Sequence, residues 1–426
     1  MPTFQTVRGM RDLLPEEAET LNHVIAKARE TAELYGYKEV ITPIVEPYEL
    51  LSAKSGEEIR QRMFTFKDLG DRTVALRPEF TASIARLATT AFKNEPKPLR
   101  TFSVGSVYRY DEPQRGRYRE FWQSDFEVIG SNRPEADAEI ILLTNSLMKA
   151  TGLRNYTFKI GHIGVIRGIL SQENVDDKTQ NAILQRMDKK EYDEAFNILN
   201  PRISRTLQGL VELKSSSAFE TVKKIKAHVK GYDDAEVAAD NLFEILKLVT
   251  ESGCEIETVD PGFGRGLEYY TGTIFEVYIP ELDIALGGGG RYDRLIEVFG
   301  GEPTPATGVA HGLDRIALAM KMQNTAQKIK QNKRVVVIPV KEEWIGDALK
   351  IAQTLREAGI PTEFEVMGRK MAKALEDADR RKVDYAVIVG EKELQQDAVV
   401  LRNLAKREQT VVAISKLAEK IRSQNE

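Results

Sequence analysis

The sequence predicts an α+β domain with an antiparallel sheet, interrupted by a helical insertion and followed by a C-terminal α/β domain. Strand–turn–strand patterns recur between residues 65 and 130, strand patterns vanish over residues 166–250, and strands alternate with helices from Arg334 onward. These three observations give the fold class. The predicted limits are 1–165 and 251–322 for the first domain, 166–250 for the insertion, 323–333 for a linker and 334–426 for the last domain.

Length and composition set the broad class of the protein. A chain of 426 residues exceeds one compact core, so two or three domains are expected. Hydrophobic residues make up 42% and charged residues 30%, which is typical of a folded rather than a disordered chain. Cys254 is the only cysteine, which excludes an internal disulfide and a zinc cage and fits a reducing compartment.

Charge and apolar runs narrow the class further. The net charge of −4 argues against a globally basic nucleic-acid binder, although local basic patches stay possible because fields are screened within about 10 Å. The N-terminus has no apolar segment of signal-peptide length, and no apolar run approaches the ~20 residues of a membrane span. We therefore expect a cytoplasmic protein.

Each element of the first domain follows from a local pattern. Residues 16–35 have apolar groups at helical spacing with acidic residues early, and Gly36 ends that helix. The next strand, 38–46, contains Pro43, which cannot donate to a sheet and so predicts an edge or an interface. The remaining predictions are a hairpin over 65–78, a helix over 79–92, strands over 100–113 and 119–130, and a helix over 134–151.

The rest of the chain divides in the same way. Residues 166–250 are rich in Lys, Glu, Ala, Leu and Gln, which favour helices. Strands are predicted again over 256–259, 273–280 and 283–287. After the polar linker, the last domain is predicted to have strands at 334–340, 361–366, 384–390, 398–404 and 410–414, with helices at 343–358, at 369–382 and at its end.

The hairpin VYRYDEPQRGRYREFWQSDFEVIG (107–130) contains four arginines within eleven residues. A solvated hairpin tip would explain a lone run of charge. However, Arg109 and Arg119 lie inside apolar strands, where an unpaired guanidinium is costly. A bound polyphosphate would supply partners, because arginine presents a planar fork of donors to phosphate oxygens.

The returning strand of this hairpin carries polar groups at alternate positions. Phe121, Gln123 and Glu127 share one face because side chains alternate along a strand. An aromatic ring at position 121 could stack on a nucleotide base. The pattern indicates the floor of a pocket.

Other segments have both a structural and a functional interpretation. Glu79 and Thr81 either cap the helix that begins there or form an acceptor pair for an ammonium group. The glycine run 287–290 is either a flexible turn or a place of close backbone approach, and it matches neither a P-loop nor a dinucleotide fingerprint. Arg315, on an apolar helix after Gly308 and Gly312, is either a salt-bridge partner or a ligand for ATP.

The order of these segments resembles that of the three signature segments of class II aminoacyl-tRNA synthetases. They are the long helix with the Pro43 strand, the arginine-bearing hairpin, and the glycine-bounded helix ending in Arg315. RGLEYYTG (265–272) and GGGRYD (288–293) are similar to the two histidine-specific segments of histidyl-tRNA synthetases, and TVRGMRDLLP (6–15) to their N-terminus. The likeness covers nearly the whole chain and is greater to the archaeal–eukaryotic branch.

The resemblance implies a class II synthetase fold, an anticodon-binding last domain, and a set of site residues. The implied histidine-binding residues are Glu79, Thr81 and Gln123 for the α-ammonium, Glu127 and Tyr270 for the imidazole nitrogens, and Tyr269 and Arg265 in the same pocket. The implied ATP-binding residues are Arg109, Asp111, Arg117, Phe121 and Arg315. Arg265 and Arg109 would be catalytic, and Gln114 and Arg115 would approach the acceptor end of the tRNA.

The implied activity is histidine–tRNA ligation. Histidine and ATP, with Mg²⁺, would form histidyl-adenylate and pyrophosphate, and the acyl group would pass to the 3′ end of tRNA(His). The resemblance also implies a homodimer that uses residues 16–47. Three positions depart from the family pattern: Phe80 and Glu268, which replace a small residue and an aspartate, and His311, to which no role is assigned.

Three alternatives compete with this interpretation. A regulatory paralogue that senses histidine would keep the core, but such proteins generally lose the last domain and the catalytic arginines, which are present here. A class II synthetase for another amino acid disagrees with Glu127 and Tyr270. A plain RNA-binding protein does not explain arginines in apolar strands beside glycines.

Overall fold

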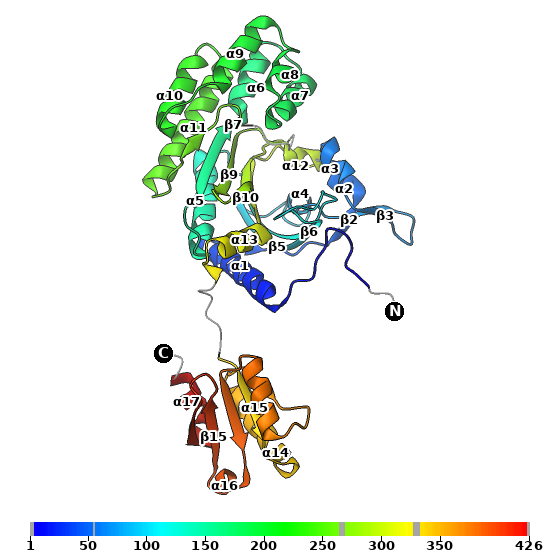
Figure 1. Cartoon of the computed structure of the whole chain (residues 1–426). Helices are drawn as coiled ribbons and strands as arrows, with labels where there is room; N and C mark the ends of the chain where they lie inside the picture. The colour runs from blue at the N-terminus through cyan, green and yellow to red at the C-terminus, as the bar shows by residue number, and fades with distance from the viewer. Residues whose placement is uncertain (1–3, 54–55, 264–268, 327–332, 424–426) are drawn as a thin grey trace. The chain divides into compact units, whose positions relative to one another are not determined.

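The computed structural model describes residues 4–53, 56–263, 269–326 and 333–423 (Figure 1). The chain divides into two compact units, Met1–Ile329 and Lys330–Glu426. Within the described residues no helix is both long and apolar enough to cross a bilayer.

The first unit is built on a mainly antiparallel sheet, which confirms the predicted α+β class. Among the described residues the sheet has eight strands in the order β1-β5-β6-β11-β10-β9-β7-β8. The outer strands β1 and β8 run parallel to their neighbours, and all other pairs are antiparallel. The bounds are β1 Lys38–Glu39, β5 Leu99–Tyr108, β6 Glu120–Ile129, β7 Thr157–His162, β8 Thr258–Val259, β9 Thr273–Ile279, β10 Leu282–Arg291 and β11 Ala306–Gly312.

One face of this sheet is covered by α1 (Pro15–Leu34), α5 (Pro134–Ala150) and α13 (Leu313–Met322). Proline in the first turn, followed by acidic side chains, starts both α1 and α5, since these residues suit the donor-rich end of a helix. Their apolar stripes bury residues such as Val24 and Ile140 completely. The opposite face of β6 is left for polar side chains.

Beyond β7 the chain forms the helices of the insertion, which Figure 1 shows in green. Side chains of Asp176, Asn200 and Ser217 accept hydrogen bonds from backbone N–H groups and so define three of the helix starts. Gly168 lets two helices meet, because a Cβ there would lie 2.4 Å from the nitrogen of Ala235. The bounds are α6 Ile163–Gln172, α7 Asp177–Asp188, α8 Tyr192–Phe196, α9 Pro201–Val211, α10 Ala218–His228 and α11 Asp233–Glu251.

A smaller antiparallel sheet with the order β2-β4-β3 completes the first unit. Pro43 lies between β1 and β2, outside the named strands, so the predicted strand over 38–46 is broken at that proline. The bounds are β2 Val45–Pro47, β3 Thr65–Lys67, β4 Thr73–Leu76, α2 Tyr48–Ala53, α3 Glu57–Gln61, α4 Thr81–Thr89 and α12 Leu295–Val298.

The second unit is the predicted α/β domain. Its sheet has the order β13-β12-β14-β15-β16, in which β12, β13 and β14 are parallel and the last two strands are antiparallel. Apolar clusters lie on both faces, as expected for parallel strands covered by helices on two sides. The bounds are β12 Val335–Pro339, β13 Thr362–Phe364, β14 Tyr385–Val389, β15 Ala398–Asn403, β16 Glu408–Ala413, α14 Ile345–Glu357, α15 Met371–Arg380, α16 Glu391–Leu394 and α17 Leu417–Ser423.

His311 lies in β11, in the core between the sheet and α5. Its side chain is completely buried, with Nδ1 3.2 Å from Ser124 Oγ and Nε2 3.0 Å from Thr144 Oγ1. Burial lowers the pKa of His311 to about 3. The residue is therefore a neutral, hydrogen-bonded part of the core.

This burial predicts a stability that falls in mild acid. In the unfolded chain His311 binds a proton below its usual pKa of 6.5, whereas in the folded chain it does so only near 3. The unfolded state thus takes up the proton first, and stability is lost as pH falls through that window. Between pH 7 and 5 the free energy of unfolding should drop by about 2 kcal/mol on this account, or roughly 4 °C in Tm by calorimetry. In His311→Gln the free energy of unfolding should lose this part of its pH dependence. An unchanged pH dependence in that variant would contradict the role of His311.

Candidate active site

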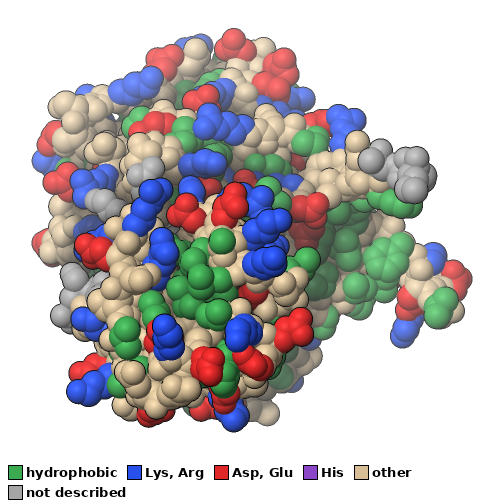
Figure 2. All heavy atoms as spheres, turned by 60° about the horizontal axis from the view of Figure 1, so that its bottom comes forward, with side chains coloured by type: hydrophobic (Ala, Val, Ile, Leu, Met, Phe, Trp, Pro, Cys, Tyr) green, Lys and Arg blue, Asp and Glu red, His purple; other side chains and the backbone are tan. Residues whose placement is uncertain are grey.

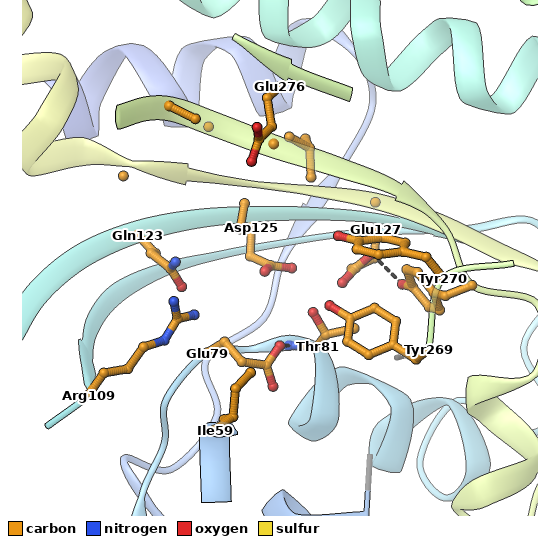
Figure 3. Close-up of a pocket in the computed structure, with 18 of the residues that line it drawn as sticks. Ile59, Glu79, Thr81, Arg109, Gln123, Asp125, Glu127, Tyr269, Tyr270 and Glu276 are labelled. Atoms are coloured by element: carbon orange, nitrogen blue, oxygen red, sulfur yellow. Dashed lines mark hydrogen bonds between the residues drawn. The ribbon is translucent and has the colours of Figure 1, made fainter. Parts of the chain in front are cut away.

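A pocket of about 310 Å³ opens on the face of the sheet opposite α5. Its floor comes from β6, β10 and β11, and α4 and the segment after residue 268 close its sides (Figure 3). Its size suits a small metabolite with part of a nucleotide. The predicted site residues that line it are Glu79, Thr81, Arg109, Phe121, Gln123, Glu127, Tyr269, Tyr270 and Arg315.

The alternation along β6 creates the floor. Ser124 and Phe126 face the helices, so Phe121, Gln123 and Glu127 face the pocket. Oε1 of Gln123 is buried and has no hydrogen-bond partner among the described residues, which leaves an acceptor for a ligand. Asp125 has the same orientation and also lines the pocket, although it is not among the predicted site residues.

Glu127 is held in place at one end of the pocket. Its side chain is buried, and Oε2 accepts a hydrogen bond from the hydroxyl of Tyr292. Burial, together with the neighbouring Glu127 carboxylate, raises the pKa of Tyr292 well above its usual value, so the hydroxyl stays a donor. Gly308 makes room for the carboxylate, because a Cβ there would lie 1.5 Å from Glu127 Oε2.

Three tyrosine rings form the wall beside Glu127. The ring centroids of Tyr269 and Tyr270 are 4.8 Å apart, and those of Tyr269 and Tyr292 are 5.8 Å apart at right angles. Figure 3 shows Tyr269 and Tyr270 next to Glu127, with Arg109 at the far end. This end of the pocket is aromatic and anionic, which suits a flat ring with N–H donors.

Glu79 caps the helix that follows it, as one of the two interpretations predicts, and it also lies in the pocket wall. Its Oε2 accepts from the backbone N–H of Thr81 at 3.0 Å and its Oε1 from that of Ala82 at 3.2 Å, so it caps α4. Glu79 and Thr81 also line the pocket. The helix start therefore fixes a carboxylate at the middle of the cavity.

The arginines gather at the other end. Nε of Arg109 donates to the carbonyl of Pro78 at 2.9 Å, and the guanidinium lies 5.4 Å from the ring centroid of Phe121. Arg315 donates to the carbonyls of Gly116 and Ala285 at 3.1 and 2.8 Å. A small adjoining hollow brings the predicted ATP-binding residues together: Arg109, Asp111, Arg117, Phe121 and Arg315.

The remaining predicted residues lie elsewhere. Gln114 and Arg115 are exposed at the tip of the β5–β6 connection and line neither cavity. Arg265 lies outside the described residues. Arg119 needs no ligand, because it donates to the carbonyl of Asp111 at 3.1 Å and its guanidinium lies 3.6 Å from the ring centroid of Tyr110.

The glycine run has two functions within β10. A Cβ on Gly289 would lie 2.0 Å from the carbonyl oxygen of Gly308, and one on Gly290 would lie 2.3 Å from that of Thr273. These two glycines thus permit close approach of the neighbouring strands. Gly287 and Gly288 line the pocket.

The charges of the site are therefore separated along its length. Carboxylates and tyrosine rings lie at one end, and arginines with an aromatic ring lie at the other. Such a pocket can hold a cationic or N–H-bearing group against a phosphate-bearing one. No cluster of three or more His, Cys, Asp or Glu in the described part of the chain could hold a metal ion.

Comparison with known proteins gives a consistent match over both units. Residues 9–316 match the family described as histidyl-tRNA synthetase, and residues 334–424 match the anticodon binding domain. The histidine–tRNA ligase of Methanocaldococcus jannaschii is 41% identical over 97% of this chain and 98% of its own length, and that of Pyrococcus furiosus is 38% identical over 98% of each. The crystal structure of histidyl-tRNA synthetase from Nostoc sp. shares the fold over the full length of both chains, with a TM-score of 0.81 at 22% identity.

Proposed function

The chain belongs to the histidyl-tRNA synthetase family and is an aminoacyl-tRNA ligase, and we propose that it joins histidine to tRNA(His) in two steps at the pocket on β6. The observation that carries this assignment to the pocket is the buried Glu127 carboxylate, fixed by Tyr292 and Gly308 beside Tyr270. A neutral imidazole has one N–H donor and one acceptor nitrogen, and a carboxylate and a phenol complement them.

Histidine would lie with its side chain at the tyrosine end of the pocket. Glu127 accepts from the imidazole N–H and Tyr270 donates to the other nitrogen, with Tyr269 packing beside them. Glu79, Thr81 and Gln123 accept from the α-ammonium group. The open Oε1 of Gln123 and the anchored Glu79 carboxylate support this, because both acceptors are already in place before the substrate binds.

ATP would lie at the arginine end. Phe121 stacks on the adenine, and Asp111 accepts from its amino group. Arg109 binds the α-phosphate, and Arg117 and Arg315 bind the far phosphates. The common hollow of these residues supports this arrangement.

The first step needs no side-chain base, because the carboxylate of histidine is ionised at neutral pH. A carboxylate oxygen bonds to the α-phosphorus, the bond from that phosphorus to the bridging oxygen breaks, and pyrophosphate leaves. Arg109, and Arg265 by the family resemblance, neutralise the charge that develops on the α-phosphate. In the second step the 3′-terminal ribose hydroxyl attacks the acyl carbon and AMP leaves, with an adenylate phosphate oxygen as the proton acceptor.

Mg²⁺ would enter this site bound to the phosphates of ATP. The described residues offer no carboxylate cluster for a dedicated metal site, whereas Mg²⁺ commonly binds through substrate phosphates and one or two carboxylates. When bound there, it would shield phosphate charge. The arginines orient the phosphates, and no step above depends on the metal.

The tRNA would bind both units. Gln114 and Arg115 would approach its acceptor end, and the second unit would bind unpaired anticodon bases. Figure 2 shows Lys and Arg interspersed with Asp and Glu on the viewed face. Basic residues are likewise scattered over residues 334–426 and form no single run, so few phosphate contacts are expected in the second unit. We retain the limits 1–165 with 251–322, 166–250 and 334–426 for the catalytic, insertion and anticodon-binding domains, and a cytoplasmic location.

Amino-acid-dependent ATP–pyrophosphate exchange, run separately with each of the twenty amino acids, tests the function. Histidine alone should support exchange, and tRNA(His) should then be charged. Binding of histidine without exchange would instead favour the regulatory paralogue. Exchange driven by another amino acid would overturn the assignment of Glu127 and Tyr270.

Gly308→Ala should abolish tight histidine binding. The new Cβ would occupy the position of Glu127 Oε2, 1.5 Å away, and would displace the carboxylate. The KM for histidine in exchange should rise roughly 100-fold or more, equivalent to about 2.7 kcal/mol. Gly346→Ala is the matched control, since nothing lies within 4 Å of a Cβ at that position. A normal KM for histidine in Gly308→Ala would refute the role of Glu127.

The chain is also proposed to form a homodimer through residues 16–47. Two large apolar side chains in this range, Leu34 and Ile41, are more than four-fifths exposed, and a partner subunit would cover them. Sedimentation at micromolar concentration should give twice the 48.0 kDa mass of the chain, and a monomer would refute the proposal.

A further inference from the structure

Residues 8–11, here called the clasp, dock onto the arginine-bearing hairpin. The carbonyl of Gly9 accepts from the backbone N–H of Arg119 at 2.8 Å, and the carbonyl of Arg8 accepts from its side chain at 3.3 Å. Gly9 has a φ of +86°, and a Cβ there would lie 2.7 Å from side-chain carbons of Arg119. The clasp is therefore fitted closely to the hairpin and is held by its backbone.

Arg11 extends the clasp to a second element. Its guanidinium lies 3.7 Å from the ring centroid of Tyr118 in the hairpin, and its Nη2 forms an ion pair with Oδ1 of Asp314 in α13. The side chain of Asp314 is only 5% exposed, whereas that of Arg11 is 31% exposed. Arg11 thus joins the hairpin to the start of α13.

Asp314 is the joint between these elements. Its Oδ2 accepts from the backbone N–H of Trp122 at 2.6 Å, so its two oxygens connect β6 and the clasp. The flanking residues are the ones proposed to hold ATP: Phe121 precedes Trp122, and Arg315 follows Asp314. A shift of this carboxylate would move both of them.

An exposed ion pair would contribute little, but this pair is not exposed at the carboxylate. Burial raises the pKa of Asp314, while the N–H of Trp122 and the charge of Arg11 act in the opposite direction. Without Arg11, a buried carboxylate would lose its charged partner and would move or take up a proton. The position of the Asp314 carboxylate therefore depends on its ion pair with Arg11.

We propose that Arg11 is a positioning residue for ATP: through Asp314 it holds Phe121 and Arg315 in the arrangement that binds the nucleotide. The proposal rests on the proposed function for the location of ATP. Glu127, which is proposed to bind the imidazole, lies six residues beyond Phe121 along β6, about 20 Å away. Histidine binding should therefore depend on Arg11 far less than ATP binding does, although Gln123 directly follows Trp122. Selective loss of ATP affinity is thus the signature of this role.

Equilibrium dialysis of the full-length protein with ATP and, separately, with histidine tests the proposal without requiring turnover. Arg11→Met should weaken ATP binding about tenfold and leave histidine binding within about twofold, and Arg11→Lys should restore most of the loss. Asp314→Asn should have the same effect, and the double variant should be no worse than the weaker-binding single variant, because both changes break one interaction. Arg72→Met, which removes an exposed arginine paired with Asp68, is the control.

Three results would overturn the proposed positioning role of Arg11. Equal loss of ATP and histidine affinity, or additive effects of the two changes, would mean that the pair only stabilises the fold. Unchanged ATP affinity in folded Arg11→Met, checked by circular dichroism, would refute it directly. If Arg11→Met does not fold, the ATP affinities of Arg11→Lys and Asp314→Asn are compared. Near-normal affinity in Arg11→Lys with a loss of about tenfold in Asp314→Asn supports the proposal, and equal affinities refute it. Failure of the wild-type protein to exchange pyrophosphate would instead refute the proposed function, while the ratio of ATP affinities would still be measured.

Discussion

Replacing Glu127 with glutamine is expected to lower kcat/KM for histidine in pyrophosphate exchange by about 10³-fold, or roughly 4 kcal/mol. Glutamine keeps the size of the side chain and can still accept from the hydroxyl of Tyr292, so the fold should be preserved. It removes the negative charge that the imidazole N–H would meet in a buried, aromatic environment. A charge-assisted hydrogen bond there is stronger than one to a neutral amide.

The same strand offers a matched control. Glu120 also lies in β6 and accepts from a tyrosine hydroxyl, that of Tyr108 at 2.9 Å, but it does not line the pocket. Glu120→Gln should leave exchange unchanged. Steady-state exchange over a range of histidine concentrations measures both variants. Equal losses in the two would mean that Glu127 supports the strand and does not read the substrate.

Arg109→Ala is expected to reduce adenylate formation by about 10²- to 10³-fold, or roughly 3–4 kcal/mol. The side chain is preset by its bond to the carbonyl of Pro78 and lies at the phosphate end of the pocket. The carboxylate of histidine and the α-phosphate both carry negative charge, so the transition state depends on a fixed cation between them. Arg109→Lys should rescue little, because lysine lacks the planar pair of donors.

Single-turnover formation of histidyl-adenylate measures this loss separately from product release. Arg100 serves as the control, because it lies near the start of β5, the strand that Arg109 follows, and pairs with Glu139 outside the pocket. Arg100→Ala should form adenylate at the normal rate. If Arg109→Ala does so as well, the phosphate role belongs elsewhere.

The period of two along β6 was sufficient to predict the pocket floor. Phe121, Gln123 and Glu127 were expected on one face, and all three line the cavity. The same rule would have found Asp125, but a single acidic residue between Ser124 and Phe126 has no distinctive chemistry in one dimension. Local periodicity is visible in a sequence because it depends only on neighbouring residues.

Long-range partners could not be predicted in this way. Tyr292, directly after β10, and Gly308, in β11, both contact Glu127 although they lie more than 160 residues farther along the chain. Neither local sequence indicates that its partner is this carboxylate. The sequence pattern of 308–320 predicts one glycine-bounded helix ending in Arg315, and this prediction is wrong. The structure instead has strand β11 up to Gly312 and a helix that begins at Leu313, so Arg315 lies in its first turn. Sheet pairing outweighed the apolar pattern there.

The sequence patterns predict the fold class correctly, but they predict no strand at β7. A six-residue strand beside a helical insertion gives little signal, whereas the class depends on many segments together. Capping at Glu79 was one of two interpretations, and the contacts show that capping and pocket lining occur in one side chain. A side chain that is proposed to bind substrate can therefore also have a structural reason for its position.

The strand order also has a consequence for synthesis on the ribosome. β6 pairs with β5 soon after both emerge, but its other neighbour, β11, begins at Ala306, after the whole insertion. At ~5–20 residues per second, the residues between Ile129 and Ala306 take roughly 9–35 s to translate. During that time the nascent chain has a strand with an unsatisfied row of backbone donors and acceptors, next to the unfinished site. Early folding of the insertion would shorten the distance that β11 must search to close this edge.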